Sequence, residues 1–65
     1  MKITVNGEPR EVAAEMLQAA LEELGYGGAE LATAVNEAFV PAAGRAGHAL
    51  SPGDRVEVLS PRQGG

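Results

Sequence analysis

Hydrophobic periodicity changes from two residues to about 3.6 and back along this 65-residue chain, and no other feature limits its possible folds as strongly. Segment 14–24 places Leu17, Leu21 and Leu24 on one helical face, with most of its glutamates off that face. Gly25 follows, where a glycine in the left-handed conformation commonly ends a helix. We therefore predict a single amphipathic helix over residues 14–24.

An alternating segment precedes the helix and predicts a β-hairpin. Residues 2–6 alternate apolar and polar side chains, as a half-buried strand does. The dipeptide Asn6-Gly7 suits a type I′ turn, whose two central residues both need positive φ. Residues 8–12 then return as a short strand at a sheet edge, because Pro9 has no N–H to donate.

Three more strands are predicted after the helix. Segment 31–35 pairs with segment 38–40 through a turn at Asn36-Glu37. A Ser51-Pro52-Gly53-Asp54 turn introduces segment 55–59, which has the clearest alternation in the chain. The chain is therefore expected to contain a second hairpin and a last strand.

This order of elements predicts an α+β fold, a mixed four- to five-stranded sheet with one helix packed on one face. Residues 41–49 lack any period and are expected to form a surface loop that carries His48. The inward-facing apolar residues should form most of the core: Ile3, Val5, Leu17, Leu21, Leu24, Val35, Phe39, Val56 and Val58.

Composition excludes several classes of function. Five basic against nine acidic residues give a net charge of −4, so nucleic acid and anionic membranes repel the chain on average. Cysteine is absent, which excludes disulfides, thiolate metal sites and a side-chain sulfur nucleophile. Because no long apolar segment or signal sequence is present, we expect a soluble, cytoplasmic protein that is monomeric alone.

Catalytic side chains are not evident either. His48 is the one histidine, and no partner residues stand at a spacing that would make it a metal ligand. None of the acidic residues lies within an apolar run that would raise its pKa. We therefore assign no general acid, general base, metal ligand or bound cofactor, and a self-contained enzyme is not expected.

The end of the sequence is unusual, because Gly64-Gly65 follows closely after a strong strand. We expect a folded domain over residues 1–60 and a flexible tail over residues 61–65. Residues without a Cβ can enter a channel too narrow for others, so a partner enzyme with ATP can convert the terminal carboxylate to an acyl-adenylate. A sulfur or amine nucleophile can then displace AMP. Taken alone, the two glycines are equally consistent with a frayed end.

The whole chain resembles the ThiS family, the sulfur carrier proteins of thiamine biosynthesis, which have the ubiquitin-like β-grasp fold. Four stretches carry the resemblance: Ile-Thr-Val-Asn-Gly-Glu at 3–8, Ala-Val-Asn-Glu-Ala-Phe-Val-Pro at 34–41, the Gly-Asp turn with its Val-Glu-Val strand within 50–59, and Pro-Arg-Gln-Gly-Gly at 61–65.

The resemblance implies a carrier on which other enzymes act. The Gly65 carboxylate would be adenylated by a ThiF-type enzyme that uses ATP, and would become a thiocarboxylate with sulfur supplied through a cysteine desulfurase. A ThiG-type thiazole synthase would then receive the sulfur. Gly64 matches the penultimate glycine that lets the tail enter both enzymes, and Arg62 and Gln63 match the part of the tail that they grip.

The sequence also suggests where such partners dock. The outward face of the sheet and the edge of the last strand near Leu59 and Arg62 adjoin the tail that an enzyme must hold. We therefore expect the docking surface there, with basic partner surfaces opposite this acidic chain.

Several other functions fit the same residues. The small subunit of molybdopterin synthase also ends in Gly-Gly, and other sulfur carriers serve tRNA thiolation or cysteine synthesis. A ubiquitin-like modifier shares the chemistry up to the adenylate but is transferred to lysines. A binding module with an inert tail would keep its function after deletion of Gly64 and Gly65.

Overall fold

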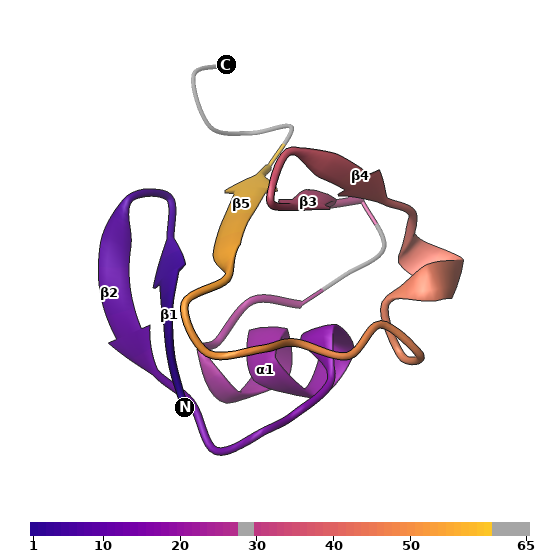
Figure 1. Cartoon of the computed structure of the whole chain (residues 1–65). Helices are drawn as coiled ribbons and strands as arrows, with labels where there is room; N and C mark the ends of the chain where they lie inside the picture. The colour runs from indigo at the N-terminus through magenta and orange to yellow at the C-terminus, as the bar shows by residue number, and fades with distance from the viewer. Residues whose placement is uncertain (28–29, 61–65) are drawn as a thin grey trace.

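In the computed structural model, residues 1–27 and 30–60 are described, and they form a five-stranded mixed sheet with one helix packed on one face (Figure 1). The elements are β1 (Lys2–Val5), β2 (Glu8–Glu11), α1 (Leu17–Glu23), β3 (Ala32–Val35), β4 (Ala38–Val40) and β5 (Arg55–Leu59), with a 3₁₀ turn at Ala42–Gly44. The strand order is β2-β1-β5-β3-β4, in which β1 and β5 are parallel and the other neighbours antiparallel. The α+β prediction is confirmed, with five strands.

The first hairpin forms as its turn residues predict. Asn6 and Gly7 have φ values of 52° and 86°, the two positive angles of a type I′ turn. Strand β2 ends at Glu11, one residue earlier than predicted. Val12 instead donates its N–H to the carbonyl of Met1 at 2.9 Å and buries its side chain in the core, with 1% exposed. The predicted core lacked this residue.

Helix α1 begins at Leu17, so the predicted start at residue 14 is wrong. The preceding backbone is bonded elsewhere. The N–H groups of Ala13 and Ala14 donate to the carboxylate of Glu23 at 2.9 to 3.1 Å, and Met16 forms an antiparallel bridge with Ala49. The two backbone donors lower the pKa of Glu23. Glu23, in the last turn of the helix, thus holds the segment that leads into its first turn.

The helix ends as predicted. Gly25 has a φ of 92°, and its N–H donates to the carbonyl of Glu22 at 3.1 Å. The N–H of Tyr26 donates to the carbonyl of Leu21 at 2.8 Å. These two bonds form a Schellman motif, which satisfies carbonyls at the end of the helix.

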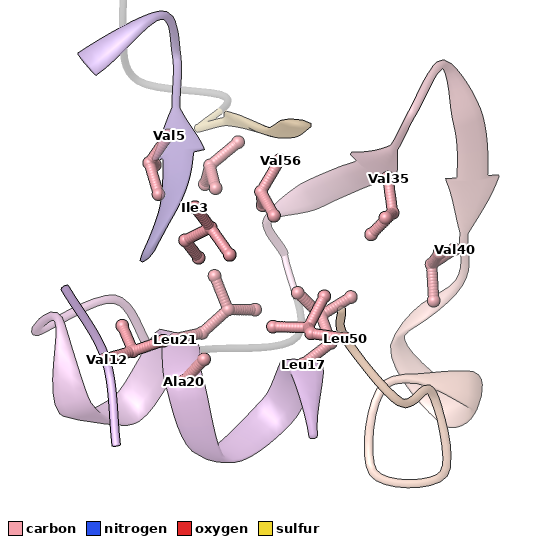
Figure 2. Packing of buried hydrophobic residues seen from close by; sticks show 11 residues of the cluster. Ile3, Val5, Val12, Leu17, Ala20, Leu21, Val35, Val40, Leu50 and Val56 are labelled. Carbon is pink, nitrogen blue, oxygen red and sulfur yellow. The ribbon is translucent and has the colours of Figure 1, made fainter. Parts of the chain in front are cut away.

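The core lies between α1 and the inner face of the sheet (Figure 2). Seven of the nine predicted core residues are buried, and Leu24 packs against them partly buried. Among the described residues, four buried hydrophobic ones were missing from the prediction: Val12, Ala20, Val40 and Leu50.

Phe39 is the predicted core residue that the structure contradicts, since 69% of it is exposed. In an antiparallel pair, residues opposite each other lie on the same face of the sheet. Val35 pairs with Ala38 across the two-residue turn, so Phe39 pairs with Ala34 on the outer face. Val40, which pairs with Thr33, points into the core in its place.

The segment 41–49 is not a simple surface loop, because Arg45 is buried, with 3% exposed. Its Nε donates to Thr33 Oγ1 at 3.1 Å, and a terminal guanidinium nitrogen donates to the carbonyl of Leu31. Thr33 Oγ1 in turn donates to the carbonyl of Val40 at 2.8 Å. The Arg45 guanidinium therefore joins β3, β4 and the chain before β3. His48, predicted at the surface, is half-buried.

Candidate functional site

An apolar surface lies on the side of the sheet that α1 leaves uncovered. We call it the outer sheet face and define it by five residues: Ala32, Ala34, Phe39, Glu57 and Leu59. Of the large hydrophobic residues in the described chain, only three are exposed, and two of them, Phe39 at 69% and Leu59 at 68%, lie here. Two large apolar side chains held in water are typical of a contact surface.

Strand pairing explains the shape of this face. Ala34 of β3 lies between Phe39 of β4 and Glu57 of β5, and Ala32 lies opposite Leu59. Because β3 carries only alanines on this side, the larger side chains of β4 and β5 border a shallow hollow. Its lining is almost wholly apolar, and the exposed Glu57 lies at its border. The outer sheet face can therefore receive an apolar side chain and a cation together.

Of the predicted site residues, Leu59 is the one whose position the structure gives. It occupies the end of β5 and points away from the core, as its alternation with Val56 and Val58 predicted. Only Ser60 separates it from the predicted tail. The tail itself, residues 61–65 with Arg62, Gln63, Gly64 and Gly65, lies outside the described residues.

Two turn asparagines hold β5, a feature that the sequence analysis missed. Asn6 follows β1, and its amide bonds the backbone of Val58 twice, accepting from the N–H at 2.8 Å and donating to the carbonyl at 3.1 Å. Asn36 follows β3, and its side-chain oxygen accepts the N–H of Arg55 at 3.0 Å. Asparagine at the first position of each hairpin turn was visible in the sequence, but its contact with β5 was not.

The turn before β5 adds a carboxylate to this arrangement. Asp54 accepts the N–H of Ser51 at 2.8 Å and the side-chain N–H of Asn36 at 3.0 Å. These donors stabilise the ionised carboxylate, the backbone N–H most, and lower the pKa of Asp54. Asp54 thus fixes the start of β5.

The same described part of the chain holds neither a metal-ligand cluster nor a membrane-spanning helix. Across residues 1–27 and 30–60, no group of three or more histidine, aspartate or glutamate side chains is placed to hold a metal ion. The helix found in this part of the chain is too short and too polar to cross a membrane. The outer sheet face, with the tail that follows it in sequence, is the candidate site.

A mixed five-stranded sheet that holds one helix on one face defines the ubiquitin-like β-grasp class of proteins. Within that class, the ThiS family matches residues 3–65, so this chain belongs to the ThiS family.

A solved structure supports the same assignment. The crystal structure of the thiamine biosynthesis protein ThiS from Geobacter metallireducens is 28% identical to this chain, with a TM-score of 0.80. The match covers 92% of this chain and 93% of that one, so the similarity extends over nearly the whole of both proteins. No curated protein sequence matches the chain. Family membership supports the role of a sulfur carrier in thiamine biosynthesis.

Proposed function

We propose that this protein carries sulfur on its C-terminal carboxylate for formation of the thiazole of thiamine. A ThiF-type enzyme adenylates Gly65, sulfur that originates with a cysteine desulfurase makes the thiocarboxylate, and a ThiG-type thiazole synthase accepts the sulfur. The observation that carries the proposal is the family match, which continues through Gly64 to Gly65. The use of ATP by the partner supports a reaction in the cytoplasm.

The chemistry requires little of this chain beyond its terminal carboxylate. A carboxylate oxygen attacks the α-phosphorus of ATP, the bond to pyrophosphate breaks, and an acyl-adenylate forms. Hydrosulfide then attacks the acyl carbon, AMP leaves with the bonding electron pair, and loss of the remaining proton gives the thiocarboxylate. Sulfur therefore travels on the main chain, which agrees with a sequence that contains no cysteine.

The outer sheet face is the docking surface that we propose for the adenylating enzyme. It borders the end of β5, so an enzyme that covers Phe39 and Leu59 also faces the origin of the tail. Glu57 lies on the same face, next to Leu59 along β5 and across Ala34 from Phe39. Because the net charge is also −4, the surface opposite should pair an apolar group with a Lys or Arg. Arg62 and Gln63 would be gripped next to this contact.

Intact-mass measurement tests the function directly. The protein is incubated with a ThiF-type enzyme, ATP and sulfide, beside a copy that lacks Gly65. We expect the full-length chain alone to gain the mass difference between sulfur and oxygen, because only its terminus presents the expected carboxylate. An unchanged mass, with the enzyme shown to be active on another carrier, would contradict the proposal. Transfer to thiazole synthase or to a molybdopterin precursor then identifies the pathway.

Replacing Phe39 by serine tests the docking surface. We expect the KM of the adenylating enzyme for this protein to rise about tenfold or more, because exposed aromatic side chains are often main contributors to binding. The unfolding midpoint should change little, since 69% of Phe39 is exposed. A Met16→Ser variant is the matched control, because Met16 is also exposed but stands at the start of α1, away from the outer sheet face. Equal KM values for both variants would place the docking surface elsewhere.

A further inference from the structure

We infer that Asn6 is a positioning residue for the C-terminal tail: its side-chain amide holds the end of β5 beyond the point where β1 stops. The inference rests on the proposed function, because it concerns how the tail reaches the adenylating enzyme. It assigns a role to a turn residue that lies outside the outer sheet face.

The need for such a residue arises from the unequal lengths of the neighbouring strands. Strand β1 is parallel to β5 and pairs with it only as far as Val56, the partner of Val5. On the other side, β3 pairs with β5 as far as Leu59, the partner of Ala32. The end of β5 therefore has a strand neighbour on one side only, and the backbone of Val58 faces the side where β1 has ended.

The side chain of Asn6 takes the place of the missing strand. The backbone N–H of Asn6 donates to the carbonyl of Val56 at 2.9 Å, which is the last main-chain bond of this ladder. The amide then acts as a substitute peptide group, because its oxygen accepts the Val58 N–H and its nitrogen donates to the Val58 carbonyl. Both bonds lie in a partly buried setting. The Asn6 side chain thus extends the hydrogen-bonded ladder along β5 from Val56 to Val58.

Asn36 makes a related contact at the other end of β5. Its φ of 50° is close to the 52° of Asn6. Its backbone N–H donates to the carbonyl of Arg55 at 2.7 Å, and its side-chain oxygen accepts the N–H of Arg55. The two asparagines therefore share a positive φ and a side-chain oxygen that accepts a β5 N–H, although the Asn36 amide nitrogen donates to Asp54 and not to the β5 backbone. Asn6 acts near the end of β5, and Asn36 acts where β5 begins.

The length of the tail makes its point of departure important. Five residues follow Ser60, and five residues span at most about 17 Å however they are arranged. An enzyme that holds the outer sheet face must receive the carboxylate of Gly65 within that reach. A shift of about 1 Å in a reacting group can lower a rate by about a hundredfold. The rate of adenylation should therefore depend on where β5 ends, because that point limits the positions that the Gly65 carboxylate can reach.

The experiment compares Asn6→Gly with Asn36→Gly in the full chain. Glycine tolerates positive φ, so each change removes an amide without straining the turn. We measure the kcat and KM of adenylation with a ThiF-type enzyme and the unfolding midpoint of each variant. For Asn6→Gly we expect kcat to fall about tenfold or more with a smaller change in KM, because the outer sheet face is retained. For Asn36→Gly we expect kcat to stay within about twofold of the unchanged protein at a similar loss of stability.

A second variant protects the test against a simple loss of folding. Asn6→Asp keeps the acceptor for the Val58 N–H but cannot donate to the Val58 carbonyl, so its kcat should lie between those of the unchanged protein and Asn6→Gly. Equal kcat values for the two glycine variants would overturn the inference, as would a kcat that follows the unfolding midpoint alone. If the unchanged protein itself is not adenylated, the proposed function fails, and that outcome is distinct from a failure of Asn6.

Discussion

Replacing Arg45 by alanine is expected to destabilise the folded protein by about 3 kcal/mol, the loss typical when a buried hydrogen-bond network is broken. Arg45 is 3% exposed and donates to the carbonyl of Leu31 and to Thr33 Oγ1. Alanine removes both donors and leaves a void where the side chain lay. Urea unfolding followed by circular dichroism measures the change in the free energy of unfolding.

The effect is large in relation to the size of the domain. A chain of 65 residues is expected to have a total stability of roughly 3 to 10 kcal/mol. The same guanidinium joins the chain before β3 to β3 itself, and Thr33 passes the connection to Val40 of β4. Loss of Arg45 should therefore loosen the sheet edge that carries Phe39.

Arg55→Ala is the matched control, because it removes the same type of side chain from an exposed position. The Arg55 side chain is 59% exposed and lies 3.8 Å from the carboxylate of Glu37. Exposed ion pairs of this kind contribute at most about 1 kcal/mol. If Arg45→Ala lowers the free energy of unfolding no more than Arg55→Ala, the buried arginine does not anchor the fold.

The first hairpin turn, the end of the helix and the alternation in β5 were all predictable from the sequence. The positive φ values of Asn6 and Gly7 follow from a type I′ turn, and Gly25 ends the helix because it adopts a left-handed conformation at little cost. The period of β5 also placed Leu59 outside the core. Each of these features depends on residues that are neighbours in the chain, so the sequence contains the necessary information.

The face of the sheet that a residue occupies after a turn depends on the length of the turn as well as on the alternation within each strand. Segment 38–40 was correctly predicted as a strand, but Val35 and Phe39 cannot both face the core when Asn36-Glu37 forms a two-residue turn. Phe39 therefore lies on the outer sheet face, as part of the candidate site, and not in the core as predicted. The parity of the hairpin would have shown this from the sequence alone.

Contacts between distant segments were not predictable in the same way. Arg45 lies in a stretch without periodicity, and its burial depends on acceptors at Leu31 and Thr33 that only the folded sheet brings to it. The contact between Asn6 and Val58 joins residues that are 52 positions apart. Neither residue type nor local spacing distinguishes these side chains from ordinary surface arginine and turn asparagine.

Replacing Gly64 by valine should lower the rate of adenylation by about a hundredfold or more while leaving the fold unchanged. The family resemblance implies that the last two residues enter a narrow channel in the partner enzyme, and a β-branched side chain adds bulk and restricts the backbone there. Misplacing a reacting carboxylate by about 1 Å is enough for an effect of this size. Single-turnover formation of the acyl-adenylate measures it.

Gly47→Val is the matched control for this prediction. A Cβ at Gly47 would meet no atom within 4 Å, so a side chain there projects into open space. Both variants should unfold at the same denaturant concentration as the unchanged protein, and only Gly64→Val should be slow in adenylation. A Gly64→Val protein that is adenylated as fast as Gly47→Val would show that the partner does not enclose the tail, and the thiocarboxylate would then have to form on a terminus exposed to water.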